Sequence, residues 1–281
     1  MTTPQLSCLM SIYLGTQAQQ LKLTLDSLAA QTRPADEIVL VEDGPISPEV
    51  QQLVAEFKQQ HPQLRSVVLA ENGGLGRALA AGLATIEMDY VARIDSDDVA
   101  FPQRFEKQLA FFSSQPANTA AVGTPVAEFE HTPGDSDTIR RLPESAAECA
   151  RYVKLNSPLN HPSVMMRTKL IKEVGGYQPV HQMEDYDLWA RLISAGYQLV
   201  NMPEALTYFR VDDAQFARRT GKGMFAAERQ MQRNLVSYGL VSRPRALLNL
   251  VMRSAYRMLP RGILRRAYAR LFHRGQHSQL T

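Results

Sequence analysis

The sequence predicts an α/β fold in which a mostly parallel central sheet is flanked by helices. Short apolar runs of strand length alternate with segments of about ten to fifteen residues whose apolar positions follow a helical period. Polar residues cluster directly after several of these runs, where the carboxyl ends of parallel strands meet. The chain of 281 residues is long enough for one large domain, alone or with an appendage.

The first part of the chain carries the clearest alternation. Apolar runs with the length and composition of buried strands occupy 6–13, 37–43, 65–69 and 90–94. The stretches between them predict helices over 20–30, over 48–60 and over an Ala- and Leu-rich segment that ends at Ile86. This order predicts consecutive βαβ units and hence parallel strands.

The second part predicts a less regular arrangement. Helical patterns cover 102–113, 144–155 and 183–192, and strand patterns cover 120–129, with a Gly-Thr-Pro break, 160–167 and 205–211. Residues 131–141 are rich in Pro, Gly and Asp, which is typical of a surface loop.

Three strand ends carry polar groups that indicate a ligand site. Glu42 and Asp43 end one strand, a Gly-rich loop at 72–77 follows the next, and residues 95–98 follow a third. Polar clusters at one edge of a parallel sheet are typical of nucleotide sites. The Gly-rich loop matches neither the dinucleotide nor the P-loop fingerprint, so it could also shape a plain turn.

The acidic triplet of Asp95, Asp97 and Asp98 is the centre of this pattern. Carboxylates so close together repel one another unless a cation or hydrogen-bond donors lie among them. Asp-x-Asp at a strand end suits a hard divalent metal that also binds phosphate oxygens. The alternative is an acidic turn that caps the following helix.

A second acidic pair, Glu184 and Asp185, begins a predicted helix after the Gly175-Gly176 turn. The helix dipole favours negative charge in the first turn, so capping could explain one of the two. A positioned general base has the same appearance.

The charge distribution sets the C-terminal segment apart. The formal net charge is +3, but residues 243–274 hold nine arginines and no acidic residue, which leaves −6 for the rest of the chain. Apolar residues recur there at helical spacing, and Pro260 with Gly262 predicts a split into two helices. Such a basic amphipathic segment favours an anionic membrane surface over nucleic acid, and the alternative is a helix packed on the body.

The remaining composition predicts a cytoplasmic globular protein. Cys8 and Cys149 have no metal-like spacing and are expected to be buried thiols in a reducing compartment. The N-terminal residues do not resemble a signal peptide, and no apolar run is long enough to span a membrane.

From Leu6 to about Gln215, the chain resembles the glycosyltransferase family 2 enzymes of the GT-A fold. The motifs that carry the resemblance are 31–44, 72–82, 92–98, 175–177 and 184–189. The finer resemblance is to transferases of bacterial exopolysaccharide biosynthesis, such as amylovoran assembly. The resemblance implies a GT-A domain over 1–215, with a nucleotide-binding half at 1–100 and an acceptor-binding half at 101–215. Residues 216–281 would form a helical segment that associates with the membrane.

The resemblance also implies roles for individual residues. Asp185 would be the general base with Glu184 beside it, His161 and Trp189 would contact the acceptor, and Asp97 and Asp98 would hold Mg²⁺ or Mn²⁺. The residues implied to bind the nucleotide-sugar are Ser11, Tyr13, Asp43, Asn72, Arg77, Arg93, Asp95, Ser96, Asp97 and Arg210. His161 could instead be a hydrogen-bonded turn residue, and Trp189 could belong to the core. Where relatives often have a His after the last strand, this chain has Asp212.

These roles imply an inverting transfer of sugar from a nucleotide-sugar, expected to be UDP-linked, to a lipid-linked glycan. The enzyme is expected to be peripheral on the cytoplasmic face of the bacterial inner membrane. The alternatives are a non-catalytic nucleotide-sugar-binding protein and a nucleotidyltransferase of similar fold.

Overall fold

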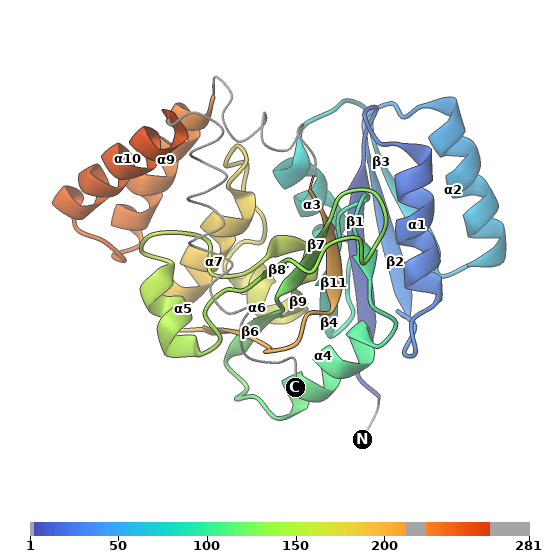
Figure 1. The fold of residues 1–281 in the computed structure, drawn as a ribbon, viewed down its shortest axis with the longest axis horizontal. Coiled ribbons are helices and arrows are strands. Elements are labelled where there is room, and N and C mark those ends of the chain that lie inside the picture. Colours follow the sequence, from blue (N-terminus) through green and yellow to red (C-terminus); the bar gives the residue numbers. More distant parts are fainter. Residues whose placement is uncertain (1–2, 212–222, 259–281) are drawn as a thin grey trace.

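The structure is a computed structural model that describes residues 3–211 and 223–258. Asp212 and the predicted helix after Pro260 lie outside these ranges. The described part is built around a seven-stranded sheet of order β10-β6-β9-β4-β1-β2-β3 (Figure 1). Its strands are β1 (Leu6–Ile12), β2 (Glu37–Asp43), β3 (Leu64–Leu69), β4 (Tyr90–Arg93), β6 (Thr119–Gly123), β9 (Met165–Arg167) and β10 (Gln198–Asn201).

The sheet is mostly parallel, as predicted. β1 pairs in parallel with β2 and β4, β2 pairs with β3, and β10 pairs with β6. The exception is β9, which is antiparallel to both β4 and β6. The carboxyl ends of β1 to β4 therefore lie at one edge, where the sequence predicts the ligand site.

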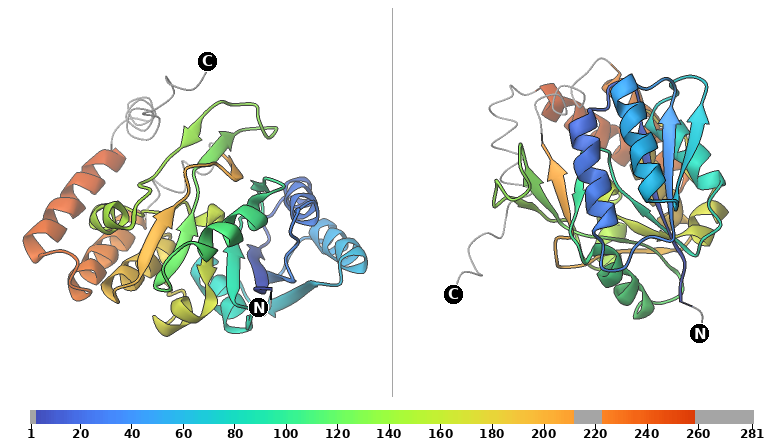
Figure 2. Two further views of the ribbon diagram at one scale, coloured as in Figure 1. Left: turned by 90° about the horizontal axis from the view of Figure 1, so that it is seen from below. Right: turned by 90° about the vertical axis from the view of Figure 1, so that its right-hand side faces the viewer.

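Helices cover both faces of the sheet, as two views show (Figures 1 and 2). One face packs against α1 (Ala18–Ala29), α2 (Pro48–Gln60) and α4 (Arg104–Ser113) through a core that includes Met10, Leu25 and Phe105. The other packs against α3 (Leu75–Ala84), α6 (Thr168–Glu173) and α7 (Glu184–Ser194) through a core that includes Leu9, Leu79 and Leu188. Alternate residues of β1 face the two layers, as the period of a strand requires.

A second, smaller sheet has the order β5-β11-β7-β8. It consists of β5 (Val99–Ala100), β11 (Thr207–Arg210), β7 (Val126–Phe129) and β8 (Ile139–Arg140). The strand predicted over 120–129 thus divides at its Gly-Thr-Pro break, so that β6 joins the large sheet and β7 the small one. The loop predicted over 131–141 ends in β8.

Shorter helices complete the described chain. The segment predicted as a strand over 160–167 contains η1 (His161–Ser163) before β9, and α5 (Ala146–Tyr152) is shorter than predicted. α9 (Met224–Ser237) and α10 (Arg243–Met258) pack together at the end of the molecule opposite α2 (Figures 1 and 2). Cys8 and Cys149 are buried free thiols, as predicted.

Candidate functional site

The carboxylate of Asp43, at the end of β2, binds the backbone of the Gly-rich loop. It accepts hydrogen bonds from the N–H groups of Gly73 at 2.8 Å and Gly74 at 2.9 Å, and the Asn72 side chain donates to the Asp43 carbonyl. A Cβ atom on Gly44, whose φ is +78°, would lie 2.6 Å from the backbone N of Asn72. The strand end and the loop therefore form one unit next to the start of α3.

Two other predicted nucleotide contacts lie exposed beside this unit. Arg77 extends over Gly73 and forms an exposed ion pair with Glu71, 3.1 Å between Nη1 and Oε1. Such a pair contributes little to stability, so the Arg77 guanidinium can exchange Glu71 for a ligand anion at small cost. At the end of β1, Tyr13 is 45% exposed and Ser11 is half-buried.

The acidic triplet follows β4 and is held by two buried arginines. Arg93, fully buried, forms an ion pair with Asp95, which is one-third exposed. Arg210, at the end of β11, donates from Nε to the carbonyl of Asp97 at 3.1 Å and packs over the Phe129 ring. The large and small sheets therefore meet at this triplet.

Asp98 differs from its neighbours because it is fully buried. Burial and the negative charges of Asp97 and Asp95 raise the pKa of the Asp98 carboxyl well above its ordinary value. Its Oδ1 accepts a hydrogen bond from the Arg210 backbone N–H. Asp98 is enclosed and its Oδ1 is bonded to Arg210, so of the two predicted metal ligands, half-buried Asp97 is the more accessible to a cation.

The second acidic pair lies across from the Gly-rich loop. A Cβ atom on Gly76, at the start of α3, would lie 3.2 Å from the Cβ of Glu184, so the first turns of α3 and α7 are in contact. Burial, together with the nearby charges of Asp185 and Asp95, raises the pKa of Glu184 to about 7. Asp185 is half-buried and accepts a hydrogen bond from Ser157 Oγ at 3.1 Å. The structure thus brings the acidic pair, Glu184 and Asp185, close to the acidic triplet, since the charge of Asp95 acts on Glu184.

Four residues that the sequence predicts to contact a ligand are buried in the structure. His161 is buried, its Nε2 lies 2.9 Å from the Tyr177 hydroxyl, and burial together with Arg93 lowers its pKa well below the usual range. Trp189 is fully buried in the core, so the prediction that it contacts the acceptor is wrong, because its side chain has no exposed surface. Arg93 and Arg210 are also buried, and their described contacts hold the acidic triplet.

Sequence reasoning missed two residues that organise the site. Tyr177 lies in a motif that the sequence singles out, but its hydrogen bond to His161 depends on the tertiary fold. Ser157 sits in a polar turn that carries no signal beyond its composition, yet it reaches Asp185.

The carboxylates of the acidic triplet are the candidate ligands for the expected divalent metal. Asp95 and Asp97 offer half-buried carboxylate oxygens, and their charges add to the effect of burial in raising the pKa of Asp98. Within the described residues, no three His, Cys, Asp or Glu side chains form a complete metal site. The donor set therefore fits a divalent cation that takes further oxygen ligands from a diphosphate.

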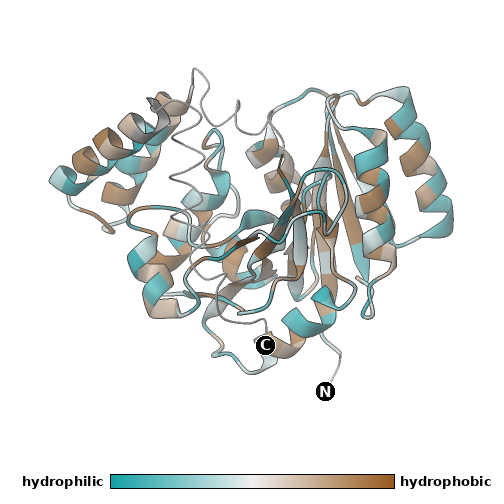
Figure 3. Cartoon of the chain, viewed as in Figure 1, coloured by the Kyte–Doolittle hydropathy of each residue, from teal (hydrophilic) through white to brown (hydrophobic). Residues whose placement is uncertain are grey.

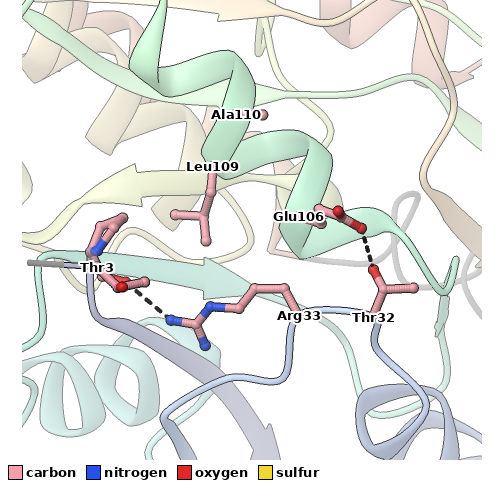
Figure 4. Close-up of a pocket in the computed structure, with 7 residues that line it drawn as sticks. Thr3, Thr32, Arg33, Glu106, Leu109 and Ala110 are labelled. Atoms are coloured by element: carbon pink, nitrogen blue, oxygen red, sulfur yellow. Dashed lines mark hydrogen bonds between the residues drawn. The ribbon is translucent and has the colours of Figure 1, made fainter.

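A separate surface hollow of about 420 Å³ lies near the amino end of β1 (Figure 4). It is lined by Thr3, Pro4, Thr32, Arg33, Glu106, Leu109 and Ala110. Because Pro4 precedes β1, this hollow lies at the sheet edge opposite the acidic triplet, and it is not the candidate site.

Comparison with known proteins identifies the family of this chain. The model of the family described as "Glycosyl transferase family 2" matches residues 7–175. An uncharacterized glycosyltransferase of Haemophilus influenzae is 37% identical over 93% of this chain and 97% of that protein. The amylovoran biosynthesis glycosyltransferase AmsE of Erwinia amylovora is 34% identical over the same shares. A UDP-Gal:alpha-D-GlcNAc-diphosphoundecaprenol beta-1,3-galactosyltransferase of Escherichia coli is 30% identical over 97% of this chain and 98% of that protein.

Solved structures show the same fold. Residues 1–349 of Staphylococcus aureus TarS, in complex with UDP-GlcNAc, align with a TM-score of 0.67 at 16% identity, over 90% of this chain and 72% of that one. The mannosyltransferase PcManGT of Pyrobaculum calidifontis, in complex with GDP-Man and Mn²⁺, aligns with a TM-score of 0.59 at 18% identity, over 96% and 81%. No helix within the described residues is long and apolar enough to cross a membrane. Motifs, fold and relatives together show that the chain belongs to glycosyl transferase family 2 and is a glycosyltransferase of the GT-A fold.

Proposed function

We propose that the protein transfers a sugar, with inversion, from a UDP-linked donor to a lipid-linked glycan during bacterial surface polysaccharide synthesis. The observation that carries the proposal is the convergence at one sheet edge of the Asp95–Asp98 triplet, the loop bound by Asp43, and the pair Glu184 and Asp185. The first two form a donor side, and the acidic pair forms an acceptor side.

The donor would lie along the carboxyl ends of β1 to β4. Ser11, Tyr13, Asp43 and Asn72 surround the place for the nucleoside, and exposed Arg77 can contact a phosphate. UDP is the nucleotide in the name of the Escherichia coli relative and in the TarS complex, which supports a UDP-sugar here.

A divalent cation, Mg²⁺ or Mn²⁺, would be held by Asp97 with Asp95. When bound, it would offset the charge on the departing diphosphate. The Mn²⁺ in the PcManGT complex supports metal use within this fold. Arg210 and Arg93 would position the metal ligands without contacting the metal, because they hold the backbone of Asp97 and the carboxylate of Asp95.

Asp185 would take the proton from the acceptor hydroxyl as its oxygen attacks the anomeric carbon. In the same step the bond from that carbon to the diphosphate breaks, and the nucleoside diphosphate leaves. Asp185 suits this role better than Glu184, because Asp185 is half-buried whereas Glu184 is only 7% exposed and so less accessible to an acceptor hydroxyl.

The lipid-linked acceptor is supported by two observations. The name of the Escherichia coli relative includes a diphosphoundecaprenol acceptor. In this chain, α10 exposes the apolar side chains of Leu247, Leu248, Val251 and Met252 within a segment rich in arginine. Figure 3 shows hydrophobic and hydrophilic residues alternating along this helix. An exposed apolar stripe flanked by cations suits an anionic membrane surface.

The test is transfer and donor hydrolysis with a panel of nucleotide-sugars and Mg²⁺ or Mn²⁺. Asp185→Asn should abolish transfer while retaining nucleotide binding, and Asp95→Ala with Asp97→Ala should weaken both. Full activity in all these variants would contradict the proposal. Release of pyrophosphate in place of a nucleoside diphosphate would indicate a nucleotidyltransferase, and binding without turnover would indicate a non-catalytic protein.

A further inference from the structure

The inner side of α10 is unusual because it is polar. Asn249 is fully buried and hydrogen-bonds Gln232 of α9, and Arg253 lies 2.8 Å from Glu228, which is also fully buried. Packing of the two helices would need only apolar side chains, whereas buried polar groups require partners in fixed positions. The polar groups therefore fix where α10 sits, and their remaining contacts show what it touches.

Those contacts converge on one turn, residues 153–157, which follows α5. Asn249 Nδ2 donates to the carbonyl of Lys154 at 2.8 Å. Arg253 Nη1 donates to the carbonyl of Leu155 at 2.7 Å and to Oδ1 of Asn156 at 3.0 Å. The Arg253 guanidinium thus forms an ion pair with Glu228 through Nε and hydrogen-bonds these two oxygens through Nη1.

The same turn contacts the proposed general base. Ser157 Oγ lies 3.1 Å from Asp185 Oδ2 and also 3.1 Å from the carbonyl of Leu159. A hydroxyl has one proton, so small shifts of the turn decide which oxygen receives it. The neighbour of Asp185 on α7, Tyr186, donates from its hydroxyl to the carbonyl of Val153 at 2.7 Å.

Three consecutive carbonyls of the turn, those of residues 153, 154 and 155, thus accept hydrogen bonds from side chains of α7 or α10. Arg253 also lies over the Tyr186 ring, 5.7 Å from its centroid. The turn is held between the helix that carries the acidic pair and the helix with the exposed apolar stripe.

We propose that Arg253 and Asn249 are positioning residues for sugar transfer: they hold the turn 153–157 so that Ser157 orients the carboxylate of Asp185. This inference rests on the proposed role of Asp185 as the base. α10 would then have two functions. Its outer side would contact the membrane, and its inner side would set the geometry of the acceptor side.

The principal variant is Glu228→Gln with Arg253→Met, which removes the arginine without leaving a buried unpaired carboxylate. We expect kcat to fall about tenfold, the effect of a misplaced base, while KM for the nucleotide-sugar changes by less than about twofold. Amide hydrogen exchange should become faster in residues 153–157. Arg243→Met is the matched control, because Arg243 is an exposed arginine of the same helix.

A double-mutant cycle with Ser157→Ala tests the route. If Arg253 acts through Ser157, Ser157→Ala should lower kcat by a similar factor, and the combined variant should be no slower than either. Multiplicative losses, or an unchanged kcat in the Glu228→Gln/Arg253→Met variant, would overturn the inference. If that variant does not fold, Arg253→Lys replaces it, since an ammonium keeps the ion pair with Glu228 but lacks the planar fork.

Asp185→Asn separates this inference from the proposed function. Wild-type transfer by Asp185→Asn would show that the base is wrongly assigned. Loss of transfer in Asp185→Asn together with normal kcat in the Arg253 variants would leave the function standing and remove the positioning role.

Discussion

Asp98 accepts a hydrogen bond on Oδ1 from the backbone N–H of Arg210, at 2.9 Å and across 112 positions of the chain. Asp98 lies in the turn between β4 of the large sheet and β5 of the small one, so the bond ties this turn to the end of β11. Because Arg210 also donates to the carbonyl of Asp97, the two residues together set the position of the whole acidic triplet. A carboxyl whose pKa is raised by burial can keep this bond in its neutral form.

Asp98→Asn should therefore fold with nearly wild-type stability, since an amide oxygen also accepts from the Arg210 N–H. Asp98→Ala should lose about 1–3 kcal/mol, because it leaves that buried N–H without an acceptor. Urea unfolding at neutral pH measures both. Equal stability of the Ala and Asn variants would show that this hydrogen bond does not hold the turn after β4 to β11.

Asp43→Ala should weaken the affinity for UDP about tenfold, because the Gly73 and Gly74 N–H groups lose the carboxylate that fixes the loop. Isothermal titration with UDP measures the change. Asp36→Ala is the matched control, since its carboxylate also accepts a backbone N–H, that of Leu6, but precedes β2 at the far edge of the sheet. Unchanged UDP affinity in Asp43→Ala would contradict the role of this strand end.

Much of the fold could be predicted because local pattern and tertiary role agree. The helix predicted over 48–60 has those limits in the structure, with Ser47 as a cap and Pro48 at its start, and the strand over 37–43 is buried as its apolar run predicts. The pattern could not show that 120–129 serves two sheets or that β9 runs antiparallel, because pairing partners depend on contacts distant in sequence.

The site divides in the same way. The carboxylates of Asp95, Asp97 and Asp185 could be found, since acidic groups at strand and helix ends stand out in a sequence. The burial of individual side chains could not be predicted. Trp189 and Asp98 are fully enclosed, and Arg210 contacts groups more than a hundred positions away in the chain. The polar inner side of α10 was also hidden, because amphipathicity alone does not tell which side faces the body.

Gly82→Ala should destabilise the protein by about 1–3 kcal/mol through overpacking. A Cβ atom at this position of α3 would lie 2.5 Å from Leu9 Cδ1 and 2.7 Å from Val41 Cγ2, both of which belong to the buried core. Thermal unfolding compares it with Ala80→Gly on the same helix, which removes a methyl group from a half-buried position. A neutral Gly82→Ala would mean that α3 can move away from the sheet.

Glu184 should make stability depend on pH. Burial raises its pKa from 4.5 to about 7, so the folded state binds a proton more tightly than the unfolded state. Its contribution is fully present below pH 4.5 and is lost as the pH rises through 7. Relative to Glu184→Gln, the wild type should therefore lose up to about 3 kcal/mol between pH 4.5 and pH 8.

Chemical unfolding of both proteins across this pH range measures the difference. Glu56→Gln, a change to an exposed carboxyl of α2, is the control and should show no such trend. A constant difference between the wild type and Glu184→Gln at all pH values would show that the carboxyl is as easily ionised in the folded as in the unfolded protein.

The exposed side of α10 should govern binding to membranes. Leu248→Glu with Val251→Glu places two carboxylates in an apolar stripe whose members are 50% and 57% exposed, so the stability of the fold should change little. Binding to vesicles that contain anionic lipid should fall about tenfold or more, because apolar contact is lost and like charges repel.

Phe225→Glu is the matched control, since Phe225 is 61% exposed but lies on α9. Sedimentation with anionic and with zwitterionic vesicles measures the effect. Equal losses in Phe225→Glu would assign the effect to charge alone, and unchanged binding in the α10 variant would remove this stripe as the membrane contact.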